Sequence, residues 1–495
     1  MAEEVYLAVD LGASGGRVVA GLLDGRKLRL EQVHRFDNGA IPAAGSLYWD
    51  VLGLWNNILH GLRAAGAKYG ARIKSVGVDT WGVDFALLGR GDVLLENPHS
   101  YRDARAIGML EKAIERVPRR EIFAETGLQF LQINTLFHLL AMAEQKSPLL
   151  EMAESFLMMP DLFHWLLTGV KSNEYTNATT TQFFNPVEKR WATELLGRLG
   201  IPSQFLGAIA YPGDNLGPLS GAVAKETGLS GVQVVLPGTH DTASAVMAVP
   251  ALGEPTDRPD WCYISSGTWS LMGAEVPTPV MTDKCLDLTF TNEGGVGGRT
   301  RLLKNITGLW LVQECRRAWN LAGKSFDWDQ LNHKASQAAP LQFLVNPDDA
   351  SFQAPGDMPA AIAAFCERTG QKVPSEEGAI VRAAIESLAL RYRQVLAGLE
   401  ELTGARVNTI HVIGGGTQNR QLCQATADAC GRRVVAGPIE ATAIGNIMTQ
   451  AVSAGAVGSI SDAREVICAS FPVEEYHPQQ TGRWDEAAER FSRLK

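Results

Sequence analysis

Residues 5–23 read VYLAVDLGASGGRVVAGLL, and this stretch sets the first expectation for the fold. An apolar run at 5–9 delivers Asp10 to a glycine-containing turn at 12–16, and a second apolar run follows from 17 to 23. Short apolar runs bounded by turn residues are typical of buried strands. The pair Asp24-Gly25 closes the second run and predicts a hairpin into a third strand over 27–36. The chain is therefore expected to open on three consecutive strands.

The same layout returns in the second half of the chain. Residues 261–264 form an apolar run, residues 265–268 read SSGT, and residues 269–272 form another run. A stretch punctuated by proline and glycine, residues 250–259, precedes it. The repeated layout indicates two related halves, and we place the domain boundary between 249 and 250, giving domains 1–249 and 250–495.

Strand and helix patterns alternate along the rest of the chain. Further strands are predicted over 75–78, 232–236 and 409–413. Helices are predicted over 50–70, 104–118, 136–145, 161–168, 378–402 and 419–430. This mixture predicts an α/β protein.

Composition limits the partners. The 495 residues carry 45 Lys and Arg against 54 Asp and Glu, a net charge of −9, and the basic residues are scattered, which argues against nucleic acid. The seven cysteines are odd in number and lack CxxC spacing, as expected of free thiols in a reducing compartment. Neither a secretory signal pattern nor an apolar run of membrane-spanning length is present. We expect a cytoplasmic protein without a membrane partner; the oligomeric state is left open.

Two motifs resemble those of other enzyme classes, but the residues around them do not match what each motif requires. Residues 12–16 match the G-x-S-x-G pattern of serine hydrolases, but a strand rather than a helix follows the turn. Gly323-Lys324-Ser325 resembles the end of a P-loop, but position 318, where the first glycine should stand, is Ala318. Neither match predicts a function.

Three glycine-rich turns are candidates for phosphate or nucleotide binding. Glycines let backbone N–H groups approach phosphate oxygens at the first turn, where Asp10 can hold Mg²⁺ through water. In the turn at 265–268 the hydroxyl of Thr268 can donate to a terminal phosphate. The turn at 414–416 lies between a strand and a helix, where nucleotides bind at the helix N-terminus. The alternatives are ordinary turns, with Thr268 satisfying a strand-end backbone group.

Asp241 is the candidate general base. It follows the apolar run 232–236 and precedes small residues of helical pattern, so it lies at the strand-to-helix position where α/β sheets bind ligands. A carboxylate there can accept the proton of an alcohol during phosphoryl transfer, with His240 as a hydrogen-bonding neighbour that touches the sugar. The alternative is that Asp241 is the N-cap of the helix.

A fourth group could bind a sugar directly. Trp81 offers an apolar face, and Arg102 and Asp103 offer hydroxyl partners. The alternatives are a core tryptophan and a surface ion pair.

Together these segments, in this order, resemble the FGGY family of carbohydrate kinases, which share the actin-like, ribonuclease-H-type ATPase fold. The resemblance runs from about residue 5 to about residue 475. It is carried by residues 9–14, 16–17, 79–85, 101–103, 174–182, 240–245, 265–273, 291–295, 303–306, 308–311 and 414–419, whereas Gly15 departs from the serine found at this position in a member of the family.

The resemblance implies two actin-like, ribonuclease-H-like domains with a catalytic cleft between them. The first would bind the sugar and phosphates and supply the base, and the second would bind ATP. The implied reaction transfers the γ-phosphoryl group of ATP to the 1-hydroxyl of L-rhamnulose, with Mg²⁺, in L-rhamnose catabolism. The residues it assigns are Asp241 as general base, Gly82, His240, Asp241, Thr242 and Asn305 at the sugar, and Ala13, Ser14, Gly15, Gly16, Arg17, Thr268, Gln313 and Gly415 at ATP.

Asn305 and Gln313 rest on the resemblance alone. Two alternatives for the function stay open: a kinase of another ketose or polyol, such as fuculose, ribulose, xylulose or glycerol, and an actin-like ATPase without a sugar acceptor.

Overall fold

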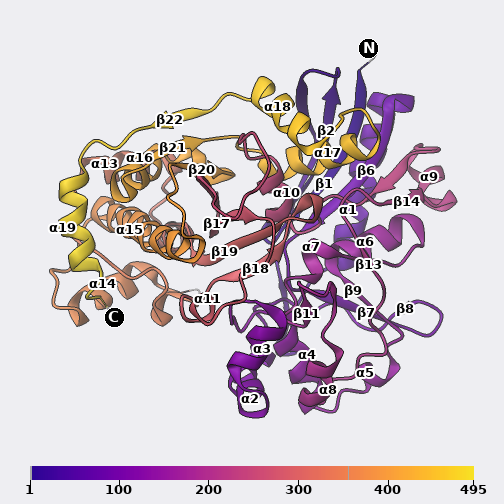
Figure 1. Cartoon of the computed structure of the whole chain (residues 1–495), viewed down its shortest axis with the longest axis horizontal. Coiled ribbons are helices and arrows are strands. Elements are labelled where there is room, and N and C mark those ends of the chain that lie inside the picture. The colour runs from indigo at the N-terminus through magenta and orange to yellow at the C-terminus, as the bar shows by residue number, and fades with distance from the viewer. Residues whose placement is uncertain (1–2, 355, 495) are drawn as a thin grey trace. The chain divides into compact units, whose positions relative to one another are not determined.

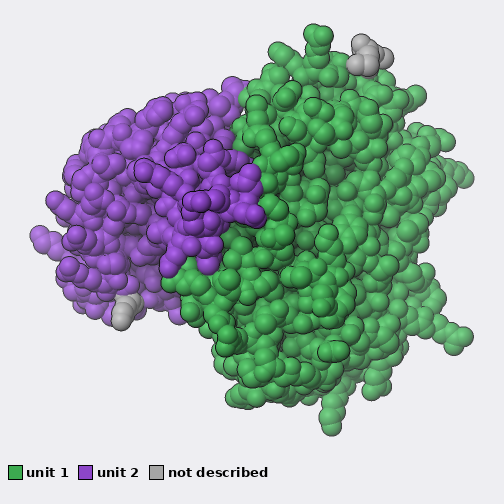
Figure 2. Space-filling view, viewed as in Figure 1, with its two compact units in different colours: residues 1–255, 275–302, 441–471 green, residues 256–274, 303–440, 472–495 purple. Residues whose placement is uncertain are grey.

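The computed structural model describes residues 3–354 and 356–494 (Figure 1). The chain divides into two compact units, shown in two colours in Figure 2. Unit 1 is Met1–Pro255, Glu275–Leu302 and Ala441–Phe471, and unit 2 is Thr256–Ala274, Leu303–Glu440 and Pro472–Lys495. The first change of unit, after Pro255, lies close to the expected boundary at 249/250, and two later segments of the chain return to unit 1.

The main sheet of unit 1 has the strand order β14-β15-β6-β1-β2-β3. Its strands are β1 (Glu4–Gly12), β2 (Gly15–Leu23), β3 (Leu28–Asp37), β6 (Ile73–Thr80), β14 (Asn215–Pro218) and β15 (Gln233–Val235). The first three are consecutive and antiparallel, which confirms the predicted strands and hairpin. Both β6 and β15 run parallel to β1.

The first turn is tighter than predicted. Strand β1 extends to Gly12 and β2 begins at Gly15, so only two residues connect them. Gly16 is buried on β2, and a Cβ atom there would lie 2.3 Å from the Phe36 ring. Packing against Phe36 therefore requires the second glycine of the pair.

Helices cover both faces of this sheet. Alternate side chains of a strand point to opposite faces. Val76 and Val78 on β6 pack into a core with α1 (Val51–Tyr69) and α6 (Met159–Thr168). Between them, a Cβ atom at Gly77 would meet Asn446 and Gln450 of α17 (Ala441–Ser453). Figure 1 shows α17, near the yellow end of the colour scale, beside the indigo β1.

A second apolar core of unit 1 forms around the small antiparallel sheet β8-β7-β9. Its strands are β7 (Phe85–Gly89), β8 (Val93–Leu94) and β9 (Ser155–Met158). The other helices of unit 1 are α2 (Met109–Arg116), α3 (Arg119–Thr126), α4 (Thr135–Glu144), α5 (Pro148–Met152), α7 (Tyr175–Ala178), α8 (Thr193–Leu199), α9 (Gly221–Thr227), α10 (Asp241–Met247), α11 (Asp283–Asp287) and α18 (Ile460–Ser470).

Strands β19, β17, β16, β20, β21 and β22 follow one another in the sheet of unit 2. Their bounds are β16 (Trp261–Ser266), β17 (Trp269–Val276), β19 (Thr300–Thr307), β20 (Thr409–Ile413), β21 (Arg433–Ala436) and β22 (Glu474–Tyr476). The helices are α12 (Trp310–Leu321), α13 (Trp328–Gln337), α14 (Met358–Arg368), α15 (Glu377–Thr403), α16 (Arg420–Cys430) and α19 (Thr481–Phe491).

The two sheets share one topology. In unit 1, β1 pairs antiparallel with β2 and parallel with β6, β6 is parallel to β15, and β15 is antiparallel to β14. In unit 2, β16 pairs antiparallel with β17 and parallel with β20, β20 is parallel to β21, and β21 is antiparallel to β22. This confirms the α/β class and the two related halves. Within the described residues no helix is long and apolar enough to cross a membrane.

Close helix packing in unit 1 gives a first testable prediction. A Cβ atom at Gly445 of α17 would lie 1.7 Å from the backbone carbonyl oxygen of Ser244 in α10. A backbone atom cannot rotate away, so Gly445→Ala must separate the two helices. We expect the free energy of unfolding to fall by about 1–3 kcal/mol, the usual cost of overpacking. Hydrogen–deuterium exchange of α10 and α17 measures it.

The matched control is Gly197→Ala at an exposed position of helix α8, where the added Cβ meets nothing within 4 Å. Alanine there should stabilise the helix by about 0.5–1 kcal/mol, because it reduces the freedom of the unfolded chain. Equal protection of α10 in both variants would contradict the packing argument.

Candidate active site

Strand ends bring three carboxylates together in unit 1. Strands β1 and β6 are parallel neighbours in which Asp10 pairs in register with Asp79. One residue further on, Thr80 of β6 forms a parallel bridge with His240, directly before α10. Asp10, Asp79 and Asp241 therefore lie at the carboxyl ends of neighbouring segments, where α/β proteins bind their ligands.

Asp10 is held by an arginine on the facing strand. Its Oδ2 accepts hydrogen bonds from Nε and Nη2 of Arg17, at 2.9 and 2.7 Å. The pair is in register on β1 and β2. Beside them, the turn residue Ser14 is exposed. The structure thus places Asp10 and the turn 13–17 together, while their roles toward Mg²⁺ and ATP stay predictions.

Asp79 was given no role from the sequence. It is fully buried, and its Oδ2 accepts a hydrogen bond of 2.5 Å from Asn446. Burial raises the pKa of Asp79 well above its usual range, and the charges of Asp10 and Asp241 act in the same direction. The sequence does show that Asp79, like Asp10, ends an apolar strand, and this could have marked it as a site residue. It does not show that Asn446, far along the chain, contacts Asp79.

The residues present fit an ATP-bound Mg²⁺. Among the described residues no cluster of three or more His, Cys, Asp or Glu side chains could hold a metal by itself. Mg²⁺ that accompanies a nucleotide needs only one or two carboxylates, with phosphates and water completing its shell. The carboxylate of Asp10, beside a turn of backbone N–H groups, matches that donor set.

Asp241 is held through one carboxylate oxygen. Its Oδ1 accepts hydrogen bonds from the backbone N–H and the hydroxyl of Thr242, at 2.6 and 3.1 Å. It is the first residue of α10, and His240 is the N-cap, so the interpretation of Asp241 as N-cap is wrong. Burial raises the pKa of Asp241; His240 opposes the rise, and the charge of Asp10 adds to it.

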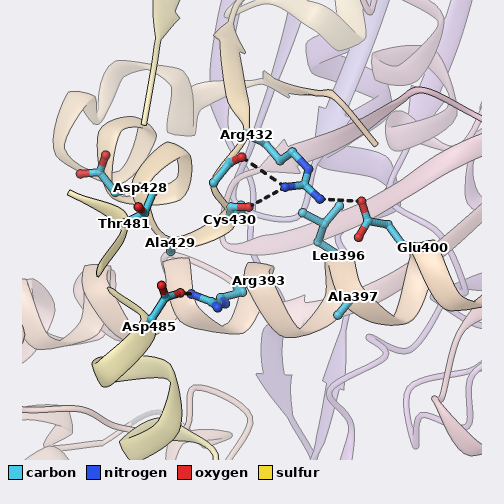
Figure 3. A pocket seen from close by; sticks show the side chains of 11 residues that line it. Arg393, Leu396, Ala397, Glu400, Asp428, Ala429, Cys430, Arg432, Thr481 and Asp485 are labelled. Atoms are coloured by element: carbon cyan, nitrogen blue, oxygen red, sulfur yellow. Dashed lines mark hydrogen bonds and ion pairs between the residues drawn. The ribbon is translucent and has the colours of Figure 1, made fainter. Parts of the chain in front are cut away.

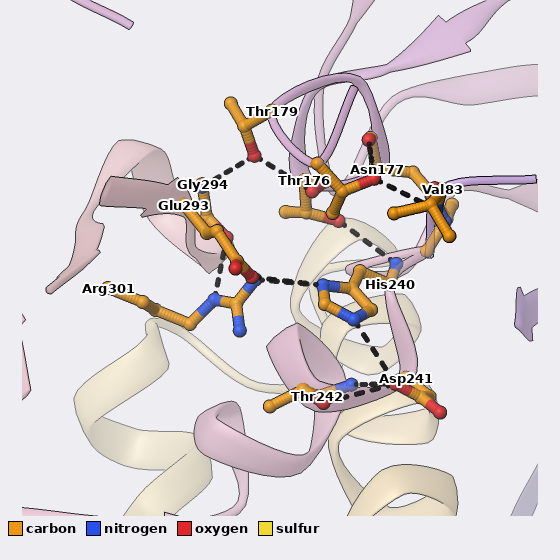
Figure 4. Close-up of polar contacts among 12 residues, drawn as sticks. Val83, Thr176, Asn177, Thr179, His240, Asp241, Thr242, Glu293, Gly294 and Arg301 are labelled. Atoms are coloured by element: carbon orange, nitrogen blue, oxygen red, sulfur yellow. Dashed lines mark hydrogen bonds and ion pairs between the residues drawn. The ribbon is translucent and has the colours of Figure 1, made fainter. Parts of the chain in front are cut away.

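The buried ion pair of Arg301 and Glu293 lies beside the imidazole of His240 (Figure 4). His240 Nδ1 lies 3.1 Å from Nη2 of Arg301 and 3.4 Å from Oε2 of Glu293. Arg301 and Glu293 also contact each other at 3.1 Å. Neither residue has a role predicted from the sequence, although a charged residue within a buried strand is itself a signal.

Gly82 lies at the entrance to a tight turn. A Cβ atom there would lie 3.1 Å from the Thr180 side chain, and the next residue, Val83, donates its N–H to Thr180 Oγ1 at 3.0 Å. Val83 also has a positive φ of 69°. The backbone thus runs close to Thr180 here, and the role of Gly82 at the sugar stays a prediction.

The tryptophan of this segment belongs to the core. Trp81 is 6% exposed, and its ring centroid lies 4.1 Å from that of Trp49. Both indole nitrogens donate to Oδ2 of Asp84, at 2.6 Å from Trp49 and 2.8 Å from Trp81. Burial raises the pKa of Asp84 to about 7, against these hydrogen bonds. Of the two interpretations of Trp81, the core tryptophan is correct.

Asp103 also has a structural role. It is 2% exposed and accepts hydrogen bonds from the backbone N–H groups of Leu47, at 2.6 Å, and Arg105, at 2.8 Å. Both oxygens of its carboxylate therefore hold backbone turns.

In unit 2 the structure brings two predicted ATP residues together. The hydroxyl of Thr268, in the turn between β16 and β17, donates to Oε1 of Gln313 on α12 at 3.0 Å. Gln313 was named from family resemblance and Thr268 from its turn, so their contact joins two independent expectations.

The second glycine turn of unit 2 packs beside the first. Strands β16 and β20 are parallel, with Ser265 opposite Ile413. A Cβ atom at Gly416 would lie 2.0 Å from Oγ of Ser266, whereas one at Gly415 would meet nothing within 4 Å. Gly416 is thus required by packing, and the backbone at Gly415 is open to a ligand. Asn305 is half-buried on β19, and its role stays a prediction.

A separate cavity in unit 2 contains none of the predicted residues. It has a volume of about 320 Å³ and lies between α15, α16 and α19 (Figure 3). Its lining includes Asp428 and the ion pairs Arg432–Glu400 and Arg393–Asp485. The cavity is not part of the candidate site.

Comparison with known proteins identifies the family. The N-terminal domain model of the FGGY family of carbohydrate kinases matches residues 5–248, and the C-terminal domain model of that family matches residues 262–454. The chain belongs to the FGGY family of carbohydrate kinases. FGGY members are ATP-dependent sugar kinases, so the enzyme class expected from the sequence is confirmed.

Curated relatives extend over nearly the whole chain. A rhamnulokinase of Bacteroides thetaiotaomicron is 45% identical over 97% of this chain and 97% of its own length. A rhamnulokinase of Oceanobacillus iheyensis is 41% identical, over 96% of this chain and 98% of its own.

Solved structures of sugar kinases share the fold. A xylulose kinase from Lactobacillus acidophilus superposes with a TM-score of 0.82 at 16% identity, covering 99% of this chain and 97% of its own. A Plasmodium falciparum glycerol kinase, solved with ADP, gives a TM-score of 0.77 at 14% identity, with the same coverage.

Proposed function

We propose that this FGGY kinase is a rhamnulokinase, which transfers the γ-phosphoryl group of ATP to the 1-hydroxyl of L-rhamnulose and yields L-rhamnulose 1-phosphate and ADP. The observation that carries the sugar identity is the similarity to curated rhamnulokinases, 39–45% identical over almost the entire chain. The solved neighbours act on other acceptors and support only the fold.

Asp241 is the general base of this reaction. Oδ1 is tied to Thr242, and the side chain is 33% exposed, so Oδ2 is the oxygen that faces the substrate. The proton of the 1-hydroxyl moves to Oδ2 as the oxygen bonds to phosphorus, a contribution of about 10²–10⁴ in rate. Phosphoryl transfer otherwise depends on alignment and charge neutralisation.

The other predicted residues bind and orient the two substrates. Gly82, His240, Thr242 and Asn305 contact the sugar in this proposal. The turn 13–17, Thr268, Gln313 and Gly415 contact ATP, and Asp10 holds Mg²⁺ through water. When bound, Mg²⁺ neutralises phosphate charge that the acidic side chains near Asp10 would otherwise repel.

A panel of acceptors tests the sugar. ADP release is measured directly with L-rhamnulose, L-fuculose, L-ribulose, D-xylulose and glycerol at equal concentration. The highest kcat/KM is expected with L-rhamnulose. A higher value with any other acceptor would replace the substrate assignment, and ADP release that no acceptor stimulates would favour the actin-like ATPase.

The raised pKa of Asp241 predicts the acid side of the pH profile. The base acts only when ionised, so the rate is full above its pKa and falls as pH drops through it. Because burial and the charge of Asp10 raise this pKa, kcat/KM should fall at a pH above about 3.9, the ordinary aspartate value.

The measurement uses initial rates at fixed ionic strength, with circular dichroism to confirm that the fold persists at each pH. His240 lowers the pKa of Asp241, but by less than burial raises it, so the acid limb still lies above the ordinary aspartate value. An acid limb at or below about 3.9 would contradict the raised pKa.

A further inference from the structure

The imidazole of His240 lies between two charged environments. On one side Nδ1 faces the Arg301–Glu293 pair, and on the other Nε2 lies 3.4 Å from Oδ1 of Asp241 (Figure 4). Whichever ring nitrogen carries the proton therefore decides what His240 offers to Asp241.

Arg301 decides the tautomer. A guanidinium group only donates hydrogen bonds, so Nδ1 must accept at the 3.1 Å contact with Nη2. The competing acceptor on that side, Oε2 of Glu293, lies further away at 3.4 Å and also accepts from Arg301. The neutral ring consequently carries its proton on Nε2, which points to Asp241.

Arg301 is fixed by its own contacts. It is fully buried on β19, and its Nε donates to the carbonyl oxygen of Gly294 at 2.7 Å. The N–H of Gly294 in turn donates to Oγ1 of Thr179 at 2.7 Å. Nη1 of Arg301 is buried without a hydrogen-bond partner among the described residues. A buried guanidinium with an unsatisfied nitrogen is costly, which calls for a role beyond packing.

We propose that Arg301, paired with Glu293, is a positioning residue that locks His240 in its Nε2–H tautomer. His240 then presents a donor to Oδ1 of Asp241, alongside the two donors of Thr242. All three hold the same oxygen, so Oδ2 stays directed to the acceptor alcohol. This catalytic consequence rests on the proposed function, whereas the tautomer itself does not depend on it.

Nitrogen-15 NMR of histidine-labelled protein tests the tautomer directly, because protonated and unprotonated ring nitrogens differ strongly in chemical shift. The chain has nine histidines, and the signal of His240 is the one lost in His240→Gln. At pH 7.5, without ligands, we expect the Nε2–H tautomer. An Nδ1–H tautomer or a doubly protonated ring in the wild-type protein overturns the proposal.

Arg301→Met removes the donor and leaves Glu293 as acceptor. The His240 proton should then move to Nδ1, and kcat with the preferred acceptor should fall about 10- to 100-fold, the loss seen in metal sites when a residue that orients a ligating side chain is removed. KM for ATP should be unchanged. An unchanged Nε2–H signal in Arg301→Met overturns the proposal.

Two further variants separate the alternatives. Glu293→Gln retains Arg301 and should retain the Nε2–H tautomer; a shift to Nδ1–H would mean that Glu293 sets it and overturn the role of Arg301. Arg120→Met removes a solvent-exposed partner of Asp283 and should change neither spectrum nor kcat. Failure of the sugar assignment appears only in the acceptor panel, so the two proposals fail separately.

Discussion

Asp241→Asn is expected to lower kcat for sugar phosphorylation about 10²- to 10⁴-fold, the range of a general base. The amide has the same shape and its Oδ1 can still accept from Thr242, so α10 should keep its start. The group in the Oδ2 position, however, becomes an NH₂ that cannot accept the proton of the alcohol. Steady-state kinetics with the preferred acceptor measure the loss.

Binding must be shown to survive in this variant. Calorimetry should give dissociation constants for sugar and nucleotide within a few-fold of the wild type. The matched control is Asp283→Asn on the surface of the same unit, which should retain full activity. A kcat near the wild-type value in Asp241→Asn would show that Asp241 is not the general base. The contacts of Thr242 and His240 with its carboxylate would then have no catalytic role.

Local pattern predicted the elements that carry the site. The strand before Asp10, the hairpin after it and the strand that precedes the 414–416 turn all appear where apolar runs meet turn residues. These strands and turns depend on sequence neighbours, so a single sequence carries their signal. Gln313, which contacts Thr268, was assigned by the family resemblance and not by local pattern.

What the sequence could not provide is the partner of each element. Helix α17 follows β21 in sequence, yet it packs in unit 1, where Asn446 reaches Asp79 and Gln450 donates to the carbonyl oxygen of Leu7. Periodicity identifies a helix but not the sheet it covers. The expected catalytic cleft between the domains stays a prediction for the same reason.

The polar residues that the sequence did not predict also depend on contacts between distant parts of the chain. Glu293 and Arg301 acquire meaning only through His240, more than fifty positions earlier. The sequence leaves two interpretations of Trp81 open, because an aromatic ring beside acidic residues also suits a sugar; its contacts with Trp49 and Asp84 place it in the core. Side-chain function thus depends on contacts that no local window contains.

Glu275→Leu is expected to destabilise unit 1 by about 3–5 kcal/mol, the cost of leaving buried charges without their counter-ion. Glu275 is 3% exposed, and its Oε2 contacts Arg464 at 2.6 Å and Arg299 at 3.3 Å. Arg464 also donates to the carbonyl oxygens of Val246 and Met247, at the end of α10. The substitution therefore affects the helix that begins with the catalytic carboxylate.

Glu254→Leu is the matched control, because Glu254 contacts the same Arg299 at 2.7 Å but is 74% exposed. Water already solvates such a charge, so its loss should cost no more than about 1 kcal/mol. Urea denaturation, with hydrogen exchange of α10 and α18 to follow unit 1 separately, measures both variants. Comparable destabilisation by the two would show that burial does not set the strength of this pairing, since they share one arginine and differ in their exposure to water.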